Sequence, residues 1–264
     1  MPKTVADYDD AVRRIAEADV PDDATTEEEV RRALRDADAP QVTGEVADGI
    51  ADSILTEDRV IEAIEASGEL PGEDEIDAIV NVSDDYGMDD RVESVEAGVR
   101  DRVATREDVT RSINERREQK GSRPTFREDV EAAVDSVAER KQIVGEGPAE
   151  ITQERSRELG APSEQEFDRA RTRTIAQGEQ VSPSEIGVSD RKTPVSVVTN
   201  DSGEAVGVVG GSNAEDRRGV AEHVGANRVF DSINDLENSF GLDQSPGRAT
   251  LTIDGEAVGE VDVE

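Results

Sequence analysis

Along about the first two thirds of the chain, apolar residues recur every three or four positions, which is the period of an α-helix with one buried face. The clearest early example is the stripe formed by Val5, Tyr8, Val12 and Ile15. Short breaks rich in proline and glycine separate one such stripe from the next. The pattern therefore predicts a helical region over residues 1–180 that is built of short amphipathic helices.

Threonines mark the expected beginnings of several of these helices. A threonine at the N-cap accepts a hydrogen bond from a first-turn N–H, and an acidic residue three positions later can accept one in return. Thr26 with Glu29 and Thr105 with Asp108 have this spacing, and Thr56 precedes an apolar stripe in the same way. We expect a helix to begin directly after each of these threonines.

Two stretches within the helical region resemble one another. Residues 46–66 align without gaps on residues 95–115, with Val, Gly, Asp, Thr and Val at matching places. Each copy predicts a short helix, a threonine-capped corner and a second helix. One such pair is too small to bury its apolar side alone, so we expect copies to pack on each other or on a partner. A chance likeness between acidic helices is the alternative.

The pattern changes towards the C-terminus, where apolar residues alternate as they do in β-strands. Residues 197–209 and 251–261 are alternating stretches interrupted by Asp-Ser-Gly and Asp-Gly, and such turns indicate β-hairpins. Between them, residues 214–224 have a helical pattern that ends before Gly225, and Ser232 is placed to cap a second helix. The order predicted here is hairpin, two helices, hairpin.

Together these patterns predict an α+β protein. An all-α N-terminal region of short amphipathic helices is followed by a small α+β C-terminal domain at residues 193–264, in which two β-hairpins flank two helices. Residues 181–192, rich in serine, proline and glycine, are expected to link the two parts.

Composition adds information about the solvent. The chain has 64 Asp and Glu against 30 Lys and Arg, a net charge of −34, and only four of its cations are lysines. This composition is similar to that of proteins from extreme halophiles, above all haloarchaea. At molar salt the Debye length falls to about 3 Å, so self-repulsion between surface carboxylates is screened. The resemblance implies adaptation to salt and leaves the function open.

Several functional classes are disfavoured by composition. The sequence has no cysteine and one histidine, so thiol chemistry, cysteine-based metal sites and a histidine-dependent catalytic triad are not expected. No apolar stretch approaches the ~20 residues that a membrane helix needs, and no cleavable leader is evident. We therefore expect no catalytic residue, no cofactor, no bound metal and no membrane partner, and a cytoplasmic location, or a virion if the protein is viral.

Three features could carry chemistry, and each has a structural interpretation. Carboxylates crowd around Gly87, but their order does not match an EF-hand loop. Residues 207–213 form a glycine-rich strand-to-helix turn that could present backbone N–H groups to a phosphate, although a helix cap explains the same residues. His223 stands at the end of a predicted helix, where it can interact with the last carbonyl groups.

Arginine-rich stretches at 100–127 and 155–173 are the departures from the acidic background. Helical basic patches can contact phosphates, but counterion release gives little driving force in molar salt. Pairing along a helix and docking onto an acidic protein surface are the alternatives, and we favour them. The candidate partner-contact residues are Arg100, Arg102, Arg106, Arg111, Arg116, Arg117, Arg123, Arg169, Arg171 and Arg173.

The function expected from these observations is that of a non-enzymatic structural or adaptor protein acting through contacts with a protein partner or in a homo-oligomer. A component of virion or provirus assembly would fit such a chain. Two alternatives stay open. One is a DNA-associated regulator that uses the helix pair at 95–117 as a helix-turn-helix, and the other is a small-ligand-binding domain at the 207–213 turn.

Overall fold

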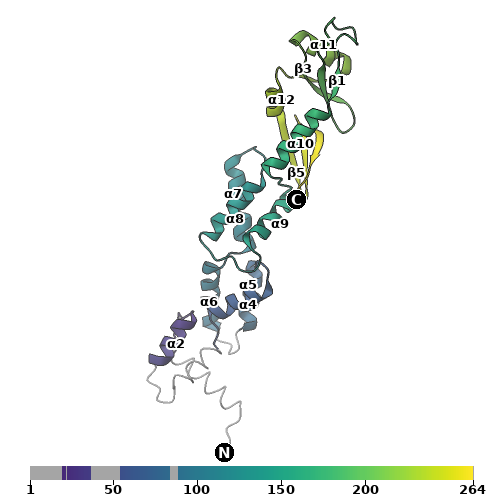
Figure 1. The fold of residues 1–264 in the computed structure, drawn as a ribbon. Coiled ribbons are helices and arrows are strands. Elements are labelled where there is room, and N and C mark those ends of the chain that lie inside the picture. The colour runs from purple at the N-terminus through teal and green to yellow at the C-terminus, as the bar shows by residue number, and fades with distance from the viewer. Residues whose placement is uncertain (1–19, 22, 37–53, 84–88, 264) are drawn as a thin grey trace, which may run out of the picture. The chain divides into compact units, whose positions relative to one another are not determined.

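The structure is a computed structural model that describes residues 20–21, 23–36, 54–83 and 89–263. It has the expected α+β fold, with helices mostly in the N-terminal part and strands in the C-terminal part (Figure 1). The chain separates into two compact units. One contains the described residues up to Glu115 together with Ala133–Pro148, and the other contains Arg116–Ala132 and the chain from Ala149 onwards. The predicted stripe at residues 5–15 lies outside the described residues.

Helices alone form the first unit. Its elements, with α7 and α8 only in part, are α2 (Glu27–Asp36), α4 (Glu57–Ser67), α5 (Glu73–Ser83), α6 (Asp89–Arg102), α7 (Arg106–Lys120) and α8 (Arg127–Ala138). Helices α4, α5 and α6 lie side by side (Figure 1). Their apolar stripes meet in a core that includes Val60, Ile64, Ile76, Val95 and Val99, each fully buried.

The second unit combines helices with two small sheets. Its further helices are α9 (Pro148–Leu159), α10 (Glu164–Gln177), α11 (Ala214–Val224) and α12 (Ile233–Ser239). A four-stranded sheet has the order β1 (Glu179–Val181), β2 (Val195–Thr199), β3 (Ala205–Gly210) and β4 (Arg228–Val229), in which only β3 and β4 are parallel. An antiparallel three-stranded sheet has the order β5 (Phe240–Ser245), β6 (Arg248–Ile253) and β7 (Glu256–Val261).

Both predicted hairpins are present, as β2–β3 and β6–β7. The predicted helices between them are also present: Asn213 caps α11, Gly225 ends it, and Ser232 caps α12. The second of these helices, α12, ends at Ser239. Phe240 begins β5, pairs with Ile253 and is buried against β6, which a local helical pattern does not reveal.

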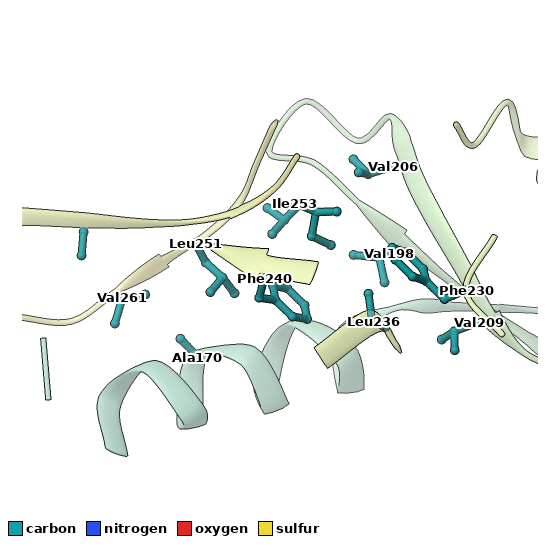
Figure 2. Close-up of a cluster of buried hydrophobic side chains, with 12 residues drawn as sticks. Ala170, Val198, Val206, Val209, Phe230, Leu236, Phe240, Leu251, Ile253 and Val261 are labelled. Carbon is teal, nitrogen blue, oxygen red and sulfur yellow. The ribbon is translucent and has the colours of Figure 1, made fainter. Parts of the chain in front are cut away.

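One hydrophobic core joins the two sheets of the second unit (Figure 2). Val198 and Val209 of the four-stranded sheet share it with Leu251 and Ile253 of β6, and Ala170 of α10 packs on the same cluster. The opposite side of β2 and β3 packs on α11. Because α10 supplies part of this core, the strands fold together with a helix that precedes them in the sequence.

The segment at residues 182–192 is an ordered loop in the structure. Its backbone closes on itself through hydrogen bonds such as that from Ser184 N to Arg191 O, at 3.1 Å. Val188 lies so close to Gly219 of α11 that a β-carbon at position 219 would overlap Val188 Cγ1. The side chain of Ser189 donates a hydrogen bond to the buried Asp216, at 2.7 Å.

The β6–β7 hairpin provides a test of its turn. Asp254 and Gly255 both have positive φ, 55° and 85°, as a two-residue type I′ turn requires. We expect Gly255→Ala to lower the free energy of unfolding by about 1 kcal/mol, because a β-carbon is unfavourable in this conformation. Gly255→Asn, which tolerates positive φ, is the matched control and should lose less. Urea unfolding in about 2 M KCl measures both; equal losses would contradict the assignment of this turn.

Candidate protein-contact surface

The beginnings of α2 and α4 cap one another. The backbone N–H of Glu57 in α4 donates to the carbonyl of Thr25, at 2.9 Å, and the Asp58 carboxylate accepts from the N–H of Glu27 in α2, at 3.0 Å. The first N–H groups of a helix have no hydrogen-bond acceptor within that helix. Here the beginning of each helix provides an acceptor for one such N–H group of the other helix. We call this reciprocal contact a helix-start lock.

A second helix-start lock joins α5 to α7. The N–H of Arg106 donates to the carbonyl of Pro71, at 3.0 Å, and the Glu107 carboxylate accepts from the N–H of Glu73, at 3.1 Å. These groups take the same places as those of the first lock. Thr56 and Thr105, matched in the sequence repeat, are the N-cap residues of α4 and α7.

The third lock, between α8 and α10, lies in the second unit. The N–H of Arg127 donates to the carbonyl of Pro162, at 2.9 Å, and the Glu128 carboxylate accepts from the N–H of Glu164, at 3.4 Å. In the first two locks the helix that supplies the carboxylate comes second in the sequence, whereas here it comes first. The same arrangement is thus reached with the opposite chain order.

Capping-box contacts reinforce at least one helix of each lock, although Gly72 has no side chain and so gives α5 only the glutamate half of a box. A glutamate three residues after the N-cap accepts a hydrogen bond from the N-cap backbone N–H. The pairs are Thr26 with Glu29 at 3.1 Å, Gly72 with Glu75 at 2.9 Å, and Ser163 with Glu166 at 2.7 Å. The expected boxes at Thr26–Glu29 and Thr105–Asp108 are confirmed, the latter by bonds of 3.2 and 3.3 Å.

The contacts of Glu75, beside the second lock, favour its ionised carboxylate. The backbone N–H of Gly72 lowers the pKa of Glu75, and the Arg106 guanidinium, 2.7 Å away, lowers this pKa further, outweighing burial. A matching pair in the third lock joins Arg127 to Glu166, at 3.3 Å. Arg106 and Arg127 are each the first residue of their helix. The backbone N–H and the side chain of each arginine therefore both contact the beginning of the other helix of the lock.

Two of the four lysines form ion pairs with aspartates in the first turn of lock helices. Lys141 contacts Asp108 at 2.8 Å, and Lys120 contacts Asp129. Both aspartates are the third residue of a helix that supplies a lock carboxylate. Burial raises the pKa of Asp108, but hydrogen bonds from Lys141 and from the N–H of Thr105 outweigh it, and the net pKa is lowered.

The first residue of α4 is the buried Glu57, whereas α7 and α8 begin with an arginine. Glu57 is only 5% exposed, accepts hydrogen bonds from the Thr25 hydroxyl and from Arg102 Nη1 at 2.9 Å, and lies against Gly98 of α6. A β-carbon at position 98 would overlap Glu57 Oε1. Gly98 lies inside α6, and its lack of a side chain leaves room for this carboxylate.

Arg91 is a structural residue that the sequence reasoning missed. Its side chain is fully buried, and its guanidinium donates to the carbonyls of Leu55 at 2.9 Å, Pro21 at 3.2 Å and Ala24. These carbonyls lie in the segments that lead into α2 and α4. Arg91 precedes both arginine-rich stretches, so the search for clusters of basic residues could not distinguish it from other surface arginines.

Ion pairs within the first unit hold four of the ten candidate contact arginines. Arg100 pairs with Asp77 at 2.5 Å and with Glu96 at 2.9 Å, and Arg102 pairs with Glu57 and Asp58. Arg106 belongs to the second lock, and Arg111 pairs with Asp108 at 3.1 Å. Arg100, Arg102 and Arg106 connect helices of their own unit, whereas Arg111 pairs within α7.

Arg116, Arg117 and Arg123 make no ion pair with any residue that the structure describes. The first two lie near the C-terminal end of α7, and Arg123 lies in the turn towards α8. Arg117 and Arg123 are exposed, and Arg116 is half-buried. We call these three residues the α7-end arginines.

Helix α10 carries the other candidates. Arg171 pairs with Asp168 at 3.0 Å and lies over the ring of Phe167, 5.8 Å from its centroid. Arg169 and Arg173 are exposed, four residues apart, and have no ion pair within the described parts of the chain. They line a small hollow of about 110 Å³ together with Asp262.

The candidate sites of the C-terminal part are occupied by structural contacts. At the 207–213 turn, Asn213 accepts the N–H of Asp216 at 2.8 Å, and Arg217 binds the carbonyl of Gly210 at 3.2 Å and the carboxylate of Asp231 at 3.0 Å. His223 lies in the last turn of α11, as expected, and its side chain is exposed. Asp84 and Asp85 of the acidic cluster around residue 87 lie outside the described residues. Elsewhere in the described chain no group of three metal-binding side chains comes together.

Comparison with known proteins provides no relative. No family model matches the chain, and neither a curated protein nor a solved structure does. Within the described ranges, no helix has the length and apolar character needed to cross a bilayer. The contacts of the chain's own residues are therefore the basis for any functional proposal.

The contact between Glu57 and Gly98 can be tested by a double-mutant cycle. Alanine is the better helix former by about 1 kcal/mol, but here its β-carbon would displace a buried, hydrogen-bonded carboxylate. We expect Gly98→Ala to lower the free energy of unfolding by about 1–3 kcal/mol. In a Glu57→Ala background the same change should be neutral or stabilising. Urea unfolding in about 2 M KCl measures the cycle, and an equal effect in both backgrounds would contradict the contact.

The hydrogen bond from the Gly72 N–H to Glu75 in the second lock predicts a pH dependence. Because the pKa of Glu75 is lowered by folding, its stabilisation is complete above the unfolded pKa of about 4.3 and is lost as the pH falls through the lower folded pKa. Glu75→Gln should therefore lower the free energy of unfolding at pH 7 by about 0.5–1 kcal/mol. The difference from the unsubstituted protein should shrink towards pH 3.

Glu62→Gln is the matched control for this comparison, since Glu62 is an exposed residue of α4 with no hydrogen bond or ion pair to the described residues. Urea unfolding at a series of pH values gives both differences. A constant difference for Glu75→Gln between pH 7 and pH 3 would show that its ionised carboxylate does not support the lock.

Proposed function

We propose that this chain is a non-enzymatic structural or adaptor protein of a high-salt environment, and that it acts through protein–protein contacts. The observation that carries the proposal is the division of the arginines into two groups. One group is used inside each unit, in locks and ion pairs. The other, which contains the α7-end arginines, Arg169 and Arg173, has no ion pair within the described residues.

A shortage of carboxylates does not account for the second group, because the chain has 64 acidic residues for 30 basic ones. Arginine presents a planar fork of donors that fits a carboxylate through two parallel hydrogen bonds, and it is favoured at protein interfaces. Exposed arginines without such a partner are therefore available to an acidic protein surface.

High salt favours a protein partner over a nucleic acid. Counterion release, which drives most binding to phosphate backbones, gives little free energy in molar salt. Direct contacts between arginine and carboxylate act at distances close to the Debye length of about 3 Å, so they are screened less than long-range attraction. The near-absence of lysine and the net charge of −34 support a high-salt setting.

Association in salt tests the proposal. We expect size-exclusion chromatography with light scattering in about 2–3 M KCl to give a mass above the 28.4 kDa of one chain, or a stable complex with a protein partner. The complex should persist as KCl is raised, since contact pairs are its main polar interaction. A strict monomer with no protein partner at any concentration would contradict the proposal, as would retention of a nucleic acid in place of a protein.

A further inference from the structure

The end of α7 is a defined surface. Its last turn closes through hydrogen bonds from the N–H of Gly121 to the carbonyls of Arg117 and Glu118, at 3.1 and 3.2 Å, and Gly121 has a φ of 67°. Lys120 is held by Asp129 and is not available for a partner. The α7-end arginines thus lie in or directly after an ordered last helical turn, Arg117 and Arg123 exposed and Arg116 half-buried, where the negative end of the helix dipole favours cations.

An acidic hollow lies in the second unit. It has a volume of about 510 Å³ and is lined by the exposed carboxylates of Glu179, Glu204 and Glu256, together with Val224 and Gly225 at the C-terminal end of α11. None of the described residues that line it is basic. Carboxylates and a helix C-terminus both make the hollow favourable for positive charge.

We infer that the α7-end arginines of one copy of this chain dock into the acidic hollow of a second copy. This inference rests on the proposed function, since it names the partner and the surface for one protein–protein contact. The two surfaces have opposite charge, and the hollow is large enough to admit several arginine side chains.

The chemistry of the two surfaces also fixes the kind of assembly. Two arginine clusters repel each other, as do two acidic hollows, so a symmetric contact between like surfaces is disfavoured. A contact between unlike surfaces is heterologous, and such contacts produce rings or open chains of copies instead of isolated dimers. We therefore expect a series of increasing masses as protein concentration rises.

Charge reversal at each surface tests the inference. The first variant combines Arg116→Glu, Arg117→Glu and Arg123→Glu, and the second combines Glu179→Lys, Glu204→Lys and Glu256→Lys. Each variant alone should associate at least about tenfold more weakly than the unsubstituted chain in about 2 M KCl. A mixture of the two variants should regain association, because each then meets a surface of opposite charge.

A control variant separates this contact from a general effect of net charge. Arg140→Glu, Arg157→Glu and Arg218→Glu together change the net charge as much as the first variant does, at exposed arginines elsewhere. This variant should associate like the unsubstituted chain. Circular dichroism and urea unfolding of every variant establish that each is folded before its association is compared.

Each outcome decides between the proposals. Loss of association in both charge-reversed variants and its return in their mixture support the inference. If the unsubstituted chain associates and the arginine variant does so equally well, or if the mixture fails to associate, the inference is overturned while the proposed function stands. If the chain forms complexes only with a different protein, the inference is again overturned while the proposed function stands. If the substitutions change only the retention of a nucleic acid, both proposals are overturned.

Discussion

The backbone N–H groups at helix beginnings are the constraint on which this structure depends. Short helices leave a large share of their N–H groups without an internal partner. At three places two helices meet by their first turns and satisfy some of these groups for each other, through one backbone carbonyl and one carboxylate. This arrangement uses acidic residues, which the chain has in excess, and places them where the helix dipole favours negative charge.

The locks also bring apolar side chains together. Val60, Val109 and Val130 each lie four residues after an N-cap position, and all three are fully buried. Valine is small, and a core built from it buries less apolar surface per residue than one built from large aromatics. The polar contacts at the helix beginnings therefore define which helices pair, while the valines provide the buried apolar surface. The arginines that form no ion pair within the described residues are the basis of the proposed contact with a partner.

Local signals in the sequence predicted much of this structure. Thr26, Thr56 and Thr105 mark true helix starts, and the Asp-Gly turn at Asp254 marks a true hairpin, because caps and tight turns depend on neighbouring residues. Strands β1 and β5 were missed, since their stability comes from pairing with strands elsewhere in the chain. The locks were missed for the same reason: Glu128 and Glu164 are 36 residues apart, and nothing local identifies them as partners. The structure also reduces the set of candidate contact arginines. Arg100, Arg102, Arg106 and Arg111 form ion pairs within their own unit.

Amide hydrogen exchange tests the helix-start locks most directly. The N–H groups of Glu57, Arg106 and Arg127 are first-turn groups, which in a helix without a lock have no internal partner and exchange readily. Here each donates to the carbonyl of another helix's N-terminal segment. We predict that all three exchange slowly in high salt, at rates close to those of amides in the middle of the same helices. Exchange at the rate of unpaired first-turn amides would contradict the locks.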